Sequence, residues 1–250
     1  MVVYRCEDTA ESIFTAVYRA YEEKRCHEDT MLCLTDDTFL FAEDVEVEAD
    51  AVKTRKVMNT LLRRFGREDC RRLSMALAAE DEEKAQAVYR TIVEGLRCKV
   101  GPGHLFDNLA RNEIHKAFAL ARGVNTEVGH QIQFLRFQEL ESGILYSRIG
   151  PKNDVLAFIM PHFADRLPIE HFVIYDEKRN VFGIHPAGRQ WYLLRGEEAD
   201  VQPRYSEEEL QYQELFRQFC HTITIEERRN RKLQQNMLPL RFREYMVEFQ

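Results

Sequence analysis

The sequence lacks the short motifs that most often build metal centres. Its six cysteines include no CxxC pair, and its eight histidines form no HExxH or HxH motif. Zinc and iron–sulfur sites usually take several ligands from such close spacings. The sequence therefore predicts reduced thiols, no local metal site and no other cofactor.

Long apolar runs are also missing. A helix that spans a bilayer needs about 20 mostly apolar residues in a row, and no stretch of this chain approaches that length. The opening residues MVVYRCEDTAES reach acids before any hydrophobic stretch of the kind a signal peptide needs. We therefore expect a cytoplasmic protein without a membrane partner.

The composition is that of a folded protein. The 250 residues are 44% hydrophobic and 31% charged, which is enough apolar surface for one sizeable core or two smaller ones. The Gly-Pro-Gly turn at 101–103 is the strongest break in the pattern. It predicts a boundary between residues 1–103 and residues 104–250, although both parts could belong to one compact domain.

The N-terminal half mixes strand-like and helix-like patterns. Residues 8–24 place apolar side chains on one helical face behind Asp8, a candidate N-cap. From residue 51 to about 100 we expect three helices, separated at Gly66 and by a cap at Asp81. The strand-like segments are residues 2–6, 30–35, 38–42 and 44–50.

Residues 36–50 contain seven acids and no base. Such a run could mimic or repel a polyanion. It could also be a solvated edge strand with Val45 and Val47 turned inward, which is the commoner use of this pattern. We favour the edge strand.

The second half predicts a long helix followed by a sheet. Apolar residues recur at helical spacing over residues 106–132, residues 151–166 are helix-like, and Ser206 starts a capping box for a helix over residues 206–220. The strand-like runs are residues 133–140, 143–150, 171–177, 180–186 and 190–196. We therefore expect an α+β fold: an N-terminal strand–helix unit with helices, then a mainly antiparallel sheet flanked by helices.

Two clusters in this half could carry chemistry. In QFLRFQEL, alternation would place Phe134 and Arg136 on one face of a central strand, either as a platform for stacking bases or as a strand with one arginine reaching solvent. His162 and Arg166 share a helical face, with Asp165 beside them and Asp176 ending the next strand. These side chains suit acid–base chemistry or a phosphate clamp, and equally a structural ion-pair network.

The C-terminus gathers positive charge in an acidic protein. The formal net charge is -7, yet residues 228–243 carry six cations and no acid. The cations are Arg228, Arg229, Arg231, Lys232, Arg241 and Arg243. With amides such as Asn230 and Gln234, they could form a helix that faces nucleic acid. They could instead dock onto carboxylates of the same chain.

Several stretches resemble a bacterial family labelled as DNA metabolism or DNA repair proteins, with a domain of unknown function. They are GHQIQFLRFQEL, HFADR, FVIYDEKR, YQELFRQF and IEERRNRKLQQNMLPLRFREYMVEF. The resemblance follows the whole chain in order and length. Family members accompany a radical-SAM protein linked to DNA repair, and in other bacteria a similar domain is fused to uracil-DNA-glycosylase-like domains. This chain lacks the CxxxCxxC motif of a radical-SAM enzyme, so the resemblance makes it the partner.

The family motifs fall on particular residues of this sequence. They are Phe134, Arg136 and Phe137 for Phe-x-Arg-Phe, His162, Phe163 and Arg166 for His-Phe-x-x-Arg, Arg228 and Asn230 for Arg-x-Asn, Pro239 and Arg241 for Pro-x-Arg, and Glu248 near the end. The sequence departs from the pattern at Phe172, where the family has tryptophan. It also lacks the tryptophan expected after the closing proline, which weakens a stacking role there.

Three hypotheses follow. The first is a DNA-associated accessory protein that binds DNA or a nucleotide beside a radical-SAM or uracil-DNA-glycosylase-like partner. The second is an enzyme acting on a nucleotide or DNA lesion, with His162 and Asp176 as catalytic candidates. In it, His162 is the acid–base group, and Arg136 and Arg166 hold phosphate. The third is an adaptor that binds only protein. The candidate nucleic-acid or phosphate contacts are Phe134, Arg136, Arg166, Arg228, Asn230, Arg231, Lys232, Gln234 and Arg241.

Overall fold

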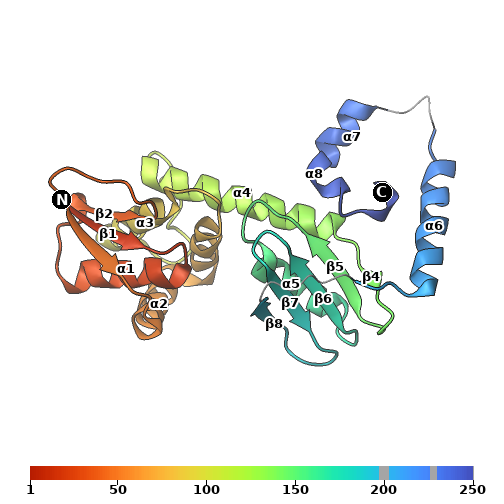
Figure 1. The fold of residues 1–250 in the computed structure, drawn as a ribbon. Coiled ribbons are helices and arrows are strands. Elements are labelled where there is room, and N and C mark those ends of the chain that lie inside the picture. The colour runs from red at the N-terminus through yellow and green to blue at the C-terminus, as the bar shows by residue number, and fades with distance from the viewer. Residues whose placement is uncertain (197–202, 226–229, 250) are drawn as a thin grey trace. The chain divides into compact units, whose positions relative to one another are not determined.

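The computed structural model describes residues 1–196, 203–225 and 230–249 and confirms the α+β class (Figure 1). Contacts divide the chain into two compact units, Met1–Thr126 and Glu127–Gln250. The division falls inside helix α4 (Asn112–Phe134) and not at the turn 101–103. Within the described residues, no helix is long and apolar enough to cross a membrane.

Unit 1 is built on a three-stranded sheet in the order β2-β1-β3, with both strand pairs parallel. Its elements are β1 (Val2–Cys6), α1 (Ala10–Glu22), η1 (His27–Asp29), β2 (Thr30–Cys33), β3 (Glu43–Val47), α2 (Ala51–Leu77), α3 (Lys84–Arg97) and the first part of α4. Parallel strands need a crossover between them, and α1 supplies it between β1 and β2.

Local chemistry explains where the helices of unit 1 begin and bend. Thr9 caps α1 by accepting a hydrogen bond from the Ser12 backbone amide at 3.1 Å. The expected cap, Asp8, instead forms an ion pair with Lys84. Gly66 has φ +80°, a conformation that suits glycine, and it kinks α2 where the sequence predicted a break between two helices.

The acidic run lies along the edge of this sheet. β3 is an edge strand whose Val47 is buried, while Asp44 pairs with Arg5 and Glu43 with Arg25. The edge-strand interpretation is therefore confirmed. The strand expected over residues 38–42 does not form: Leu40 and Phe41 are 88% and 98% exposed, and no described strand pairs with this stretch.

Unit 2 holds a five-stranded sheet in the order β4-β5-β6-β7-β8. Its elements after the end of α4 are β4 (Gln138–Glu139), β5 (Leu145–Ile149), α5 (Leu156–Arg166), β6 (Phe172–Asp176), β7 (Val181–His185), β8 (Tyr192–Arg195), α6 (Glu207–Thr222), α7 (Arg231–Met237), α8 (Leu240–Arg243) and η3 (Val247–Phe249). Three of its strand pairs are antiparallel, and β5 pairs with β6 in parallel because α5 returns the chain between them.

α5 packs tightly on this sheet. A Cβ added to Gly183 on β7 would lie 2.5 Å from the Met160 sulfur and 3.1 Å from a Leu156 methyl. The absence of a side chain at Gly183 therefore lets the helix approach the strand closely. The apolar side chains of α5, together with Phe172 and Ile174 of β6, form the buried core of unit 2.

The prediction that Phe134 and Arg136 lie on a central strand is wrong. Phe134 is the last residue of α4, Arg136 follows in a loop, and the only strand of this run is the short edge strand β4. The apolar spacing of α4 continues through residue 135, which is 9% exposed. The packing of that helical face outweighs the local alternation of FLRF.

Candidate functional site

The end of α4 forms an aromatic cluster with α8. The Phe134 ring lies 5.4 Å from the Phe242 ring, and the His130 ring lies 5.8 Å from Phe134 and 5.6 Å from Phe242. Phe242 is 4% exposed. Phe134 therefore packs against the C-terminal segment, defined here as residues 230–249, and offers no open sheet face for stacking.

Arg136 is tied to the same segment. Its guanidinium donates to Glu248 at 3.0 Å and to the backbone carbonyls of Gln133 and Leu135. The Glu248 side chain is only 11% exposed. Two residues of the family motifs, far apart in sequence, thus meet as an ion pair that holds the end of the chain.

Glu127 is the main anchor for the C-terminal segment. Its side chain is 2% exposed, accepts three hydrogen bonds and forms one ion pair, so both carboxylate oxygens have partners. The backbone amides of Lys152 and Asn153 donate at 3.0 and 2.9 Å, and the Asn153 amide group donates at 2.7 Å. The ion pair with Arg241 has an N–O distance of 3.2 Å. Arg241 thus takes the role of a docking cation that pairs with the chain's own acid.

A third contact lies at the ends of β5 and β6. The Tyr245 hydroxyl donates to the Glu177 carboxylate. Burial and the neighbouring Glu177 raise the pKa of Tyr245 far above its usual value, so the donor stays protonated. A Cβ at Gly150 would lie 2.0 Å from the Tyr245 oxygen, so only glycine fits beneath this ring.

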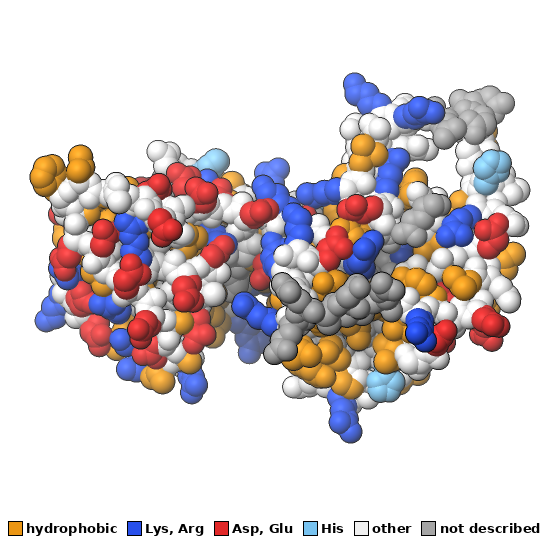
Figure 2. Space-filling view, in the orientation of Figure 1, with side chains coloured by type: hydrophobic (Ala, Val, Ile, Leu, Met, Phe, Trp, Pro, Cys, Tyr) orange, Lys and Arg blue, Asp and Glu red, His pale blue; other side chains and the backbone are white. Residues whose placement is uncertain are grey.

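α7 carries its charge differently. Asn230 caps the helix by accepting from the Leu233 amide at 3.0 Å. Arg231, Lys232 and Gln234 are exposed, and neither cation pairs with a carboxylate of the described residues. Figure 2 shows Lys and Arg side chains standing out on the surface around α7. Arg228 lies outside the described residues.

His162 and Arg166 lie together on an exposed face of α5, as their spacing predicted. The rings of His162 and Phe163 are nearly perpendicular with centroids 5.1 Å apart, and Phe163 is buried. Within the part of the chain that the structure describes, neither His162 nor Arg166 forms an ion pair. The His-Phe-x-x-Arg motif therefore divides into a core aromatic and an open polar pair.

Asp176 is buried at the end of β6 and organises the turn that follows. One carboxylate oxygen accepts from the backbone amides of Lys178 and Arg179, and the other from the Arg179 guanidinium at 3.2 Å. Arg179 also donates to the carbonyls of Pro151 and Lys152. Burial raises the pKa of Asp176, and Arg179 opposes that rise. Among the described residues, the hydrogen bonds and the ion pair of this turn do not involve His162.

α6 keeps a large apolar surface in solvent. One face of the helix carries apolar side chains that are between 41% and 68% exposed. They are Tyr212, Leu215, Phe216 and Phe219, with Ile223 directly after the helix on the same side. On the inward side of the helix, Gln213 is buried, and the Arg217 guanidinium donates a hydrogen bond to the Val247 carbonyl. Figure 2 shows hydrophobic side chains along this helix.

Sequence reasoning missed Glu127. Its signal is present, because Val124 and Val128 flank it on the apolar face of α4 and all three are at most 5% exposed. An acid in such a position must be paired to be tolerated. Among the described residues, no group of three or more His, Cys, Asp or Glu side chains is placed to hold a metal ion.

Residues 82–248 match the model of a family described as a domain of unknown function, DUF4130. The chain belongs to this family. The match includes α3, α4 and nearly all of unit 2, including both partners of the Arg136–Glu248 and Arg241–Glu127 pairs. A search of curated proteins and a search of solved structures found no match.

Proposed function

We propose that this protein is a DNA-associated accessory protein of DNA metabolism or repair. It contacts DNA phosphates through Arg231 and Lys232 of α7, with Arg228 as a further contact suggested by the sequence. It works beside a radical-SAM or uracil-DNA-glycosylase-like partner, as the sequence resemblance implies.

One observation carries the DNA proposal. Arg231 and Lys232 are exposed and unpaired among the described residues, although the protein is acidic and holds many carboxylates. Arg241, in the same segment, does pair with a buried carboxylate. Cations that needed only an internal partner would be expected to resemble Arg241. Exposed, unpaired cations are the groups that bind phosphate with release of counterions.

A second candidate function is protein docking through α6. The exposed apolar side chains of this helix form the kind of continuous surface that usually marks an interaction site. This surface supports the adaptor hypothesis, and it also supplies a place for the partner protein in the accessory hypothesis. DNA affinity in the absence of any partner separates the two.

The enzyme hypothesis receives less support. His162 and Arg166 are available on the surface of α5, but Asp176 is buried and its oxygens are occupied by Arg179 and backbone amides. An acid so engaged serves to shape a turn. Turnover of an oligonucleotide containing a damaged base, lost in His162→Ala, would restore the enzyme hypothesis.

The test is a salt titration of duplex oligonucleotide binding. For wild type, log affinity should fall with log salt, and Arg231→Ala/Lys232→Ala should flatten the slope by about 1.8, or about 0.9 for each lost phosphate contact. The matched control is Arg189→Ala/Arg195→Ala, which removes two exposed cations elsewhere in unit 2. A slope that is equal in wild type and the α7 variant would overturn the proposed contact.

A further inference from the structure

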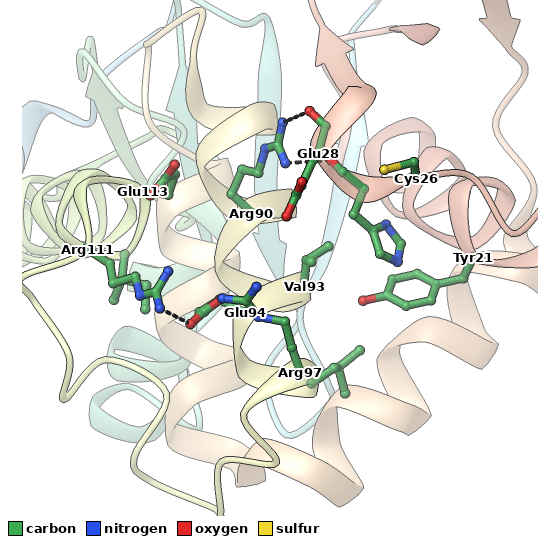
Figure 3. A pocket seen from close by; sticks show the side chains of 12 residues that line it. Tyr21, Cys26, Glu28, Arg90, Val93, Glu94, Arg97, Arg111 and Glu113 are labelled. Atoms are coloured by element: carbon green, nitrogen blue, oxygen red, sulfur yellow. Dashed lines mark hydrogen bonds and ion pairs between the residues drawn. The ribbon is translucent and has the colours of Figure 1, made fainter. Parts of the chain in front are cut away.

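Unit 1 contains a pocket that involves no residue of the C-terminal segment. It has a volume of about 640 Å³ and opens beside α3 (Figure 3). Its walls come from the end of α1, the stretch around η1, the outer face of α3 and the start of α4. This volume is within the usual range for small-molecule sites.

One wall of the pocket is aromatic and fixed in place. The rings of Tyr21 and His27 lie 4.4 Å apart, and the His27 Nδ1 is 2.7 Å from the hydroxyl of the fully buried Tyr89. Burial and the nearby Arg90 lower the pKa of His27, so its ring is neutral. Burial raises the pKa of Tyr21 to about 12, which keeps its hydroxyl as a donor. Neutral rings of this kind stack well on a planar heterocycle.

The opposite part of the pocket holds two arginines on one carboxylate. Glu94 accepts from Arg97 at 2.7 Å and from Arg111 at 3.0 Å, and Figure 3 shows all three side chains together. The arginines are 58% and 46% exposed, whereas Glu94 is 15% exposed. Each guanidinium has five N–H donors, so most donors remain for a second acceptor. Two cations sharing one acid also leave positive charge uncompensated.

The third arginine of the pocket has a different task. Arg90 donates to the backbone carbonyls of His27, Glu28 and Thr30 at 2.5, 3.2 and 3.2 Å, which fixes the stretch that carries the aromatic wall. Glu28 and Glu113 also line the pocket, so the three arginines of the lining are matched by three glutamates. The lining as a whole is formally neutral, and its excess of cations is confined to Arg97 and Arg111, which share Glu94. This local excess suits one small anionic group better than a polyanion.

Apolar side chains complete the pocket between these two parts. Val93 and Leu96 of α3 and Ile114 of α4 line it together with the aromatic and arginine walls. A ligand that satisfies every wall has a flat ring, an apolar middle and an anion that can accept from a guanidinium fork.

We propose that this pocket binds a nucleoside 5′-monophosphate, with the base against Tyr21 and His27 and the phosphate on Arg97 and Arg111. The site lies in unit 1 and uses none of the residues assigned to DNA contact. Its failure would therefore leave the proposed function of unit 2 untouched, and the converse also holds.

The experiment is calorimetric titration of the full chain with the four deoxynucleoside 5′-monophosphates, the matching nucleosides and inorganic phosphate. At least one monophosphate should bind about tenfold or more tightly than both its nucleoside and inorganic phosphate, because only it engages both walls. No monophosphate binding at millimolar concentration would overturn the proposal. Equal binding of inorganic phosphate would overturn it as well, since the aromatic wall would then contribute nothing.

Variants test each wall separately. Arg97→Ala and Arg111→Ala should each weaken monophosphate binding about tenfold or more, while Arg63→Ala, on an exposed part of α2, should bind as wild type does. Tyr21→Phe keeps the ring and should retain stacking, whereas Tyr21→Ala should lose about tenfold or more. A melting curve for each variant establishes folding. Unchanged affinity in a folded Arg111→Ala protein would contradict the assignment.

Discussion

Both ends of the C-terminal segment carry cations, but they use them differently. In α8 and η3, Arg241 binds Glu127 and Glu248 binds Arg136, and these contacts hold the segment on unit 2. In α7, Arg231 and Lys232 extend into solvent without a carboxylate partner among the described residues. The end with α8 and η3 anchors the segment on unit 2, and α7 exposes its cations to solvent.

The difference follows from the burial of the acids. Glu127 is 2% exposed and Glu248 11% exposed, so each loses most of its hydration and needs a partner inside the fold. An exposed acid has no such need, and an ion pair in solvent contributes little. Positive charge at the anchor is therefore required by the fold, whereas the two α7 cations have no carboxylate partner among the described residues.

The largest expected effect comes from removing the central acid of the anchor. Glu127→Ala should lower the free energy of unfolding by about 3–5 kcal/mol, because Arg241 and two backbone amides lose a buried acceptor. Urea unfolding measures it through the fluorescence of Trp191, the single tryptophan, which lies in unit 2. Glu141→Ala, at an exposed site in the same unit, is the control. If the two variants were equally stable, Glu127 would not anchor the C-terminal segment.

Removing the cation should cost less than removing the acid. In Arg241→Ala, Glu127 keeps the three donors from Lys152 and Asn153, so we expect a loss of about 2 kcal/mol. The same urea titration measures it. A loss as large as that of Glu127→Ala would mean that the three remaining donors do not support the carboxylate by themselves.

Much of the fold follows from the sequence for physical reasons. The strands β5 to β7 and the helix α5 lie in the segments that the sequence pattern predicted, because each has one face on the core. The strand β8 also lies in its predicted segment, but its side chains are exposed, and its pairing with β7 holds it in the sheet. The error at Phe134 has an equally physical origin. FLRF alternates over four residues, which suits a short strand, but the longer apolar face of α4 continues through it and packs on Phe242.

The candidate site was less predictable. Sequence spacing correctly placed His162 and Arg166 on one helical face, since that depends on a single helix. It did not pair Arg136 with Glu248, because that contact joins residues 112 positions apart. The pocket beside α3 likewise combines Tyr21 and Arg111, whose proximity depends on how the helices of unit 1 pack. Local pattern carries no information about such contacts.

A smaller effect is expected at the second ion pair of the anchor. In a double-mutant cycle with Arg136→Ala and Glu248→Ala, the coupling between the two side chains should be about 1 kcal/mol, because Arg136 is 34% exposed and Glu248 is nearly buried. Urea unfolding of the four proteins supplies the values. A coupling of zero would show that the segment is held by Phe242 and Glu127 without help from this pair.

The smallest effect on stability should come from α7, and it decides the comparison. Arg231→Ala/Lys232→Ala removes two exposed cations that pair with no described carboxylate, so the urea midpoint should stay at the wild-type value. The same variant should flatten the salt dependence of DNA binding, whereas Arg241→Ala should lower the midpoint and keep the slope. A lowered midpoint with an unchanged slope in the α7 variant would reverse the assignment. Both ends of the segment would then serve the fold, and α6 would remain as the surface that binds a partner.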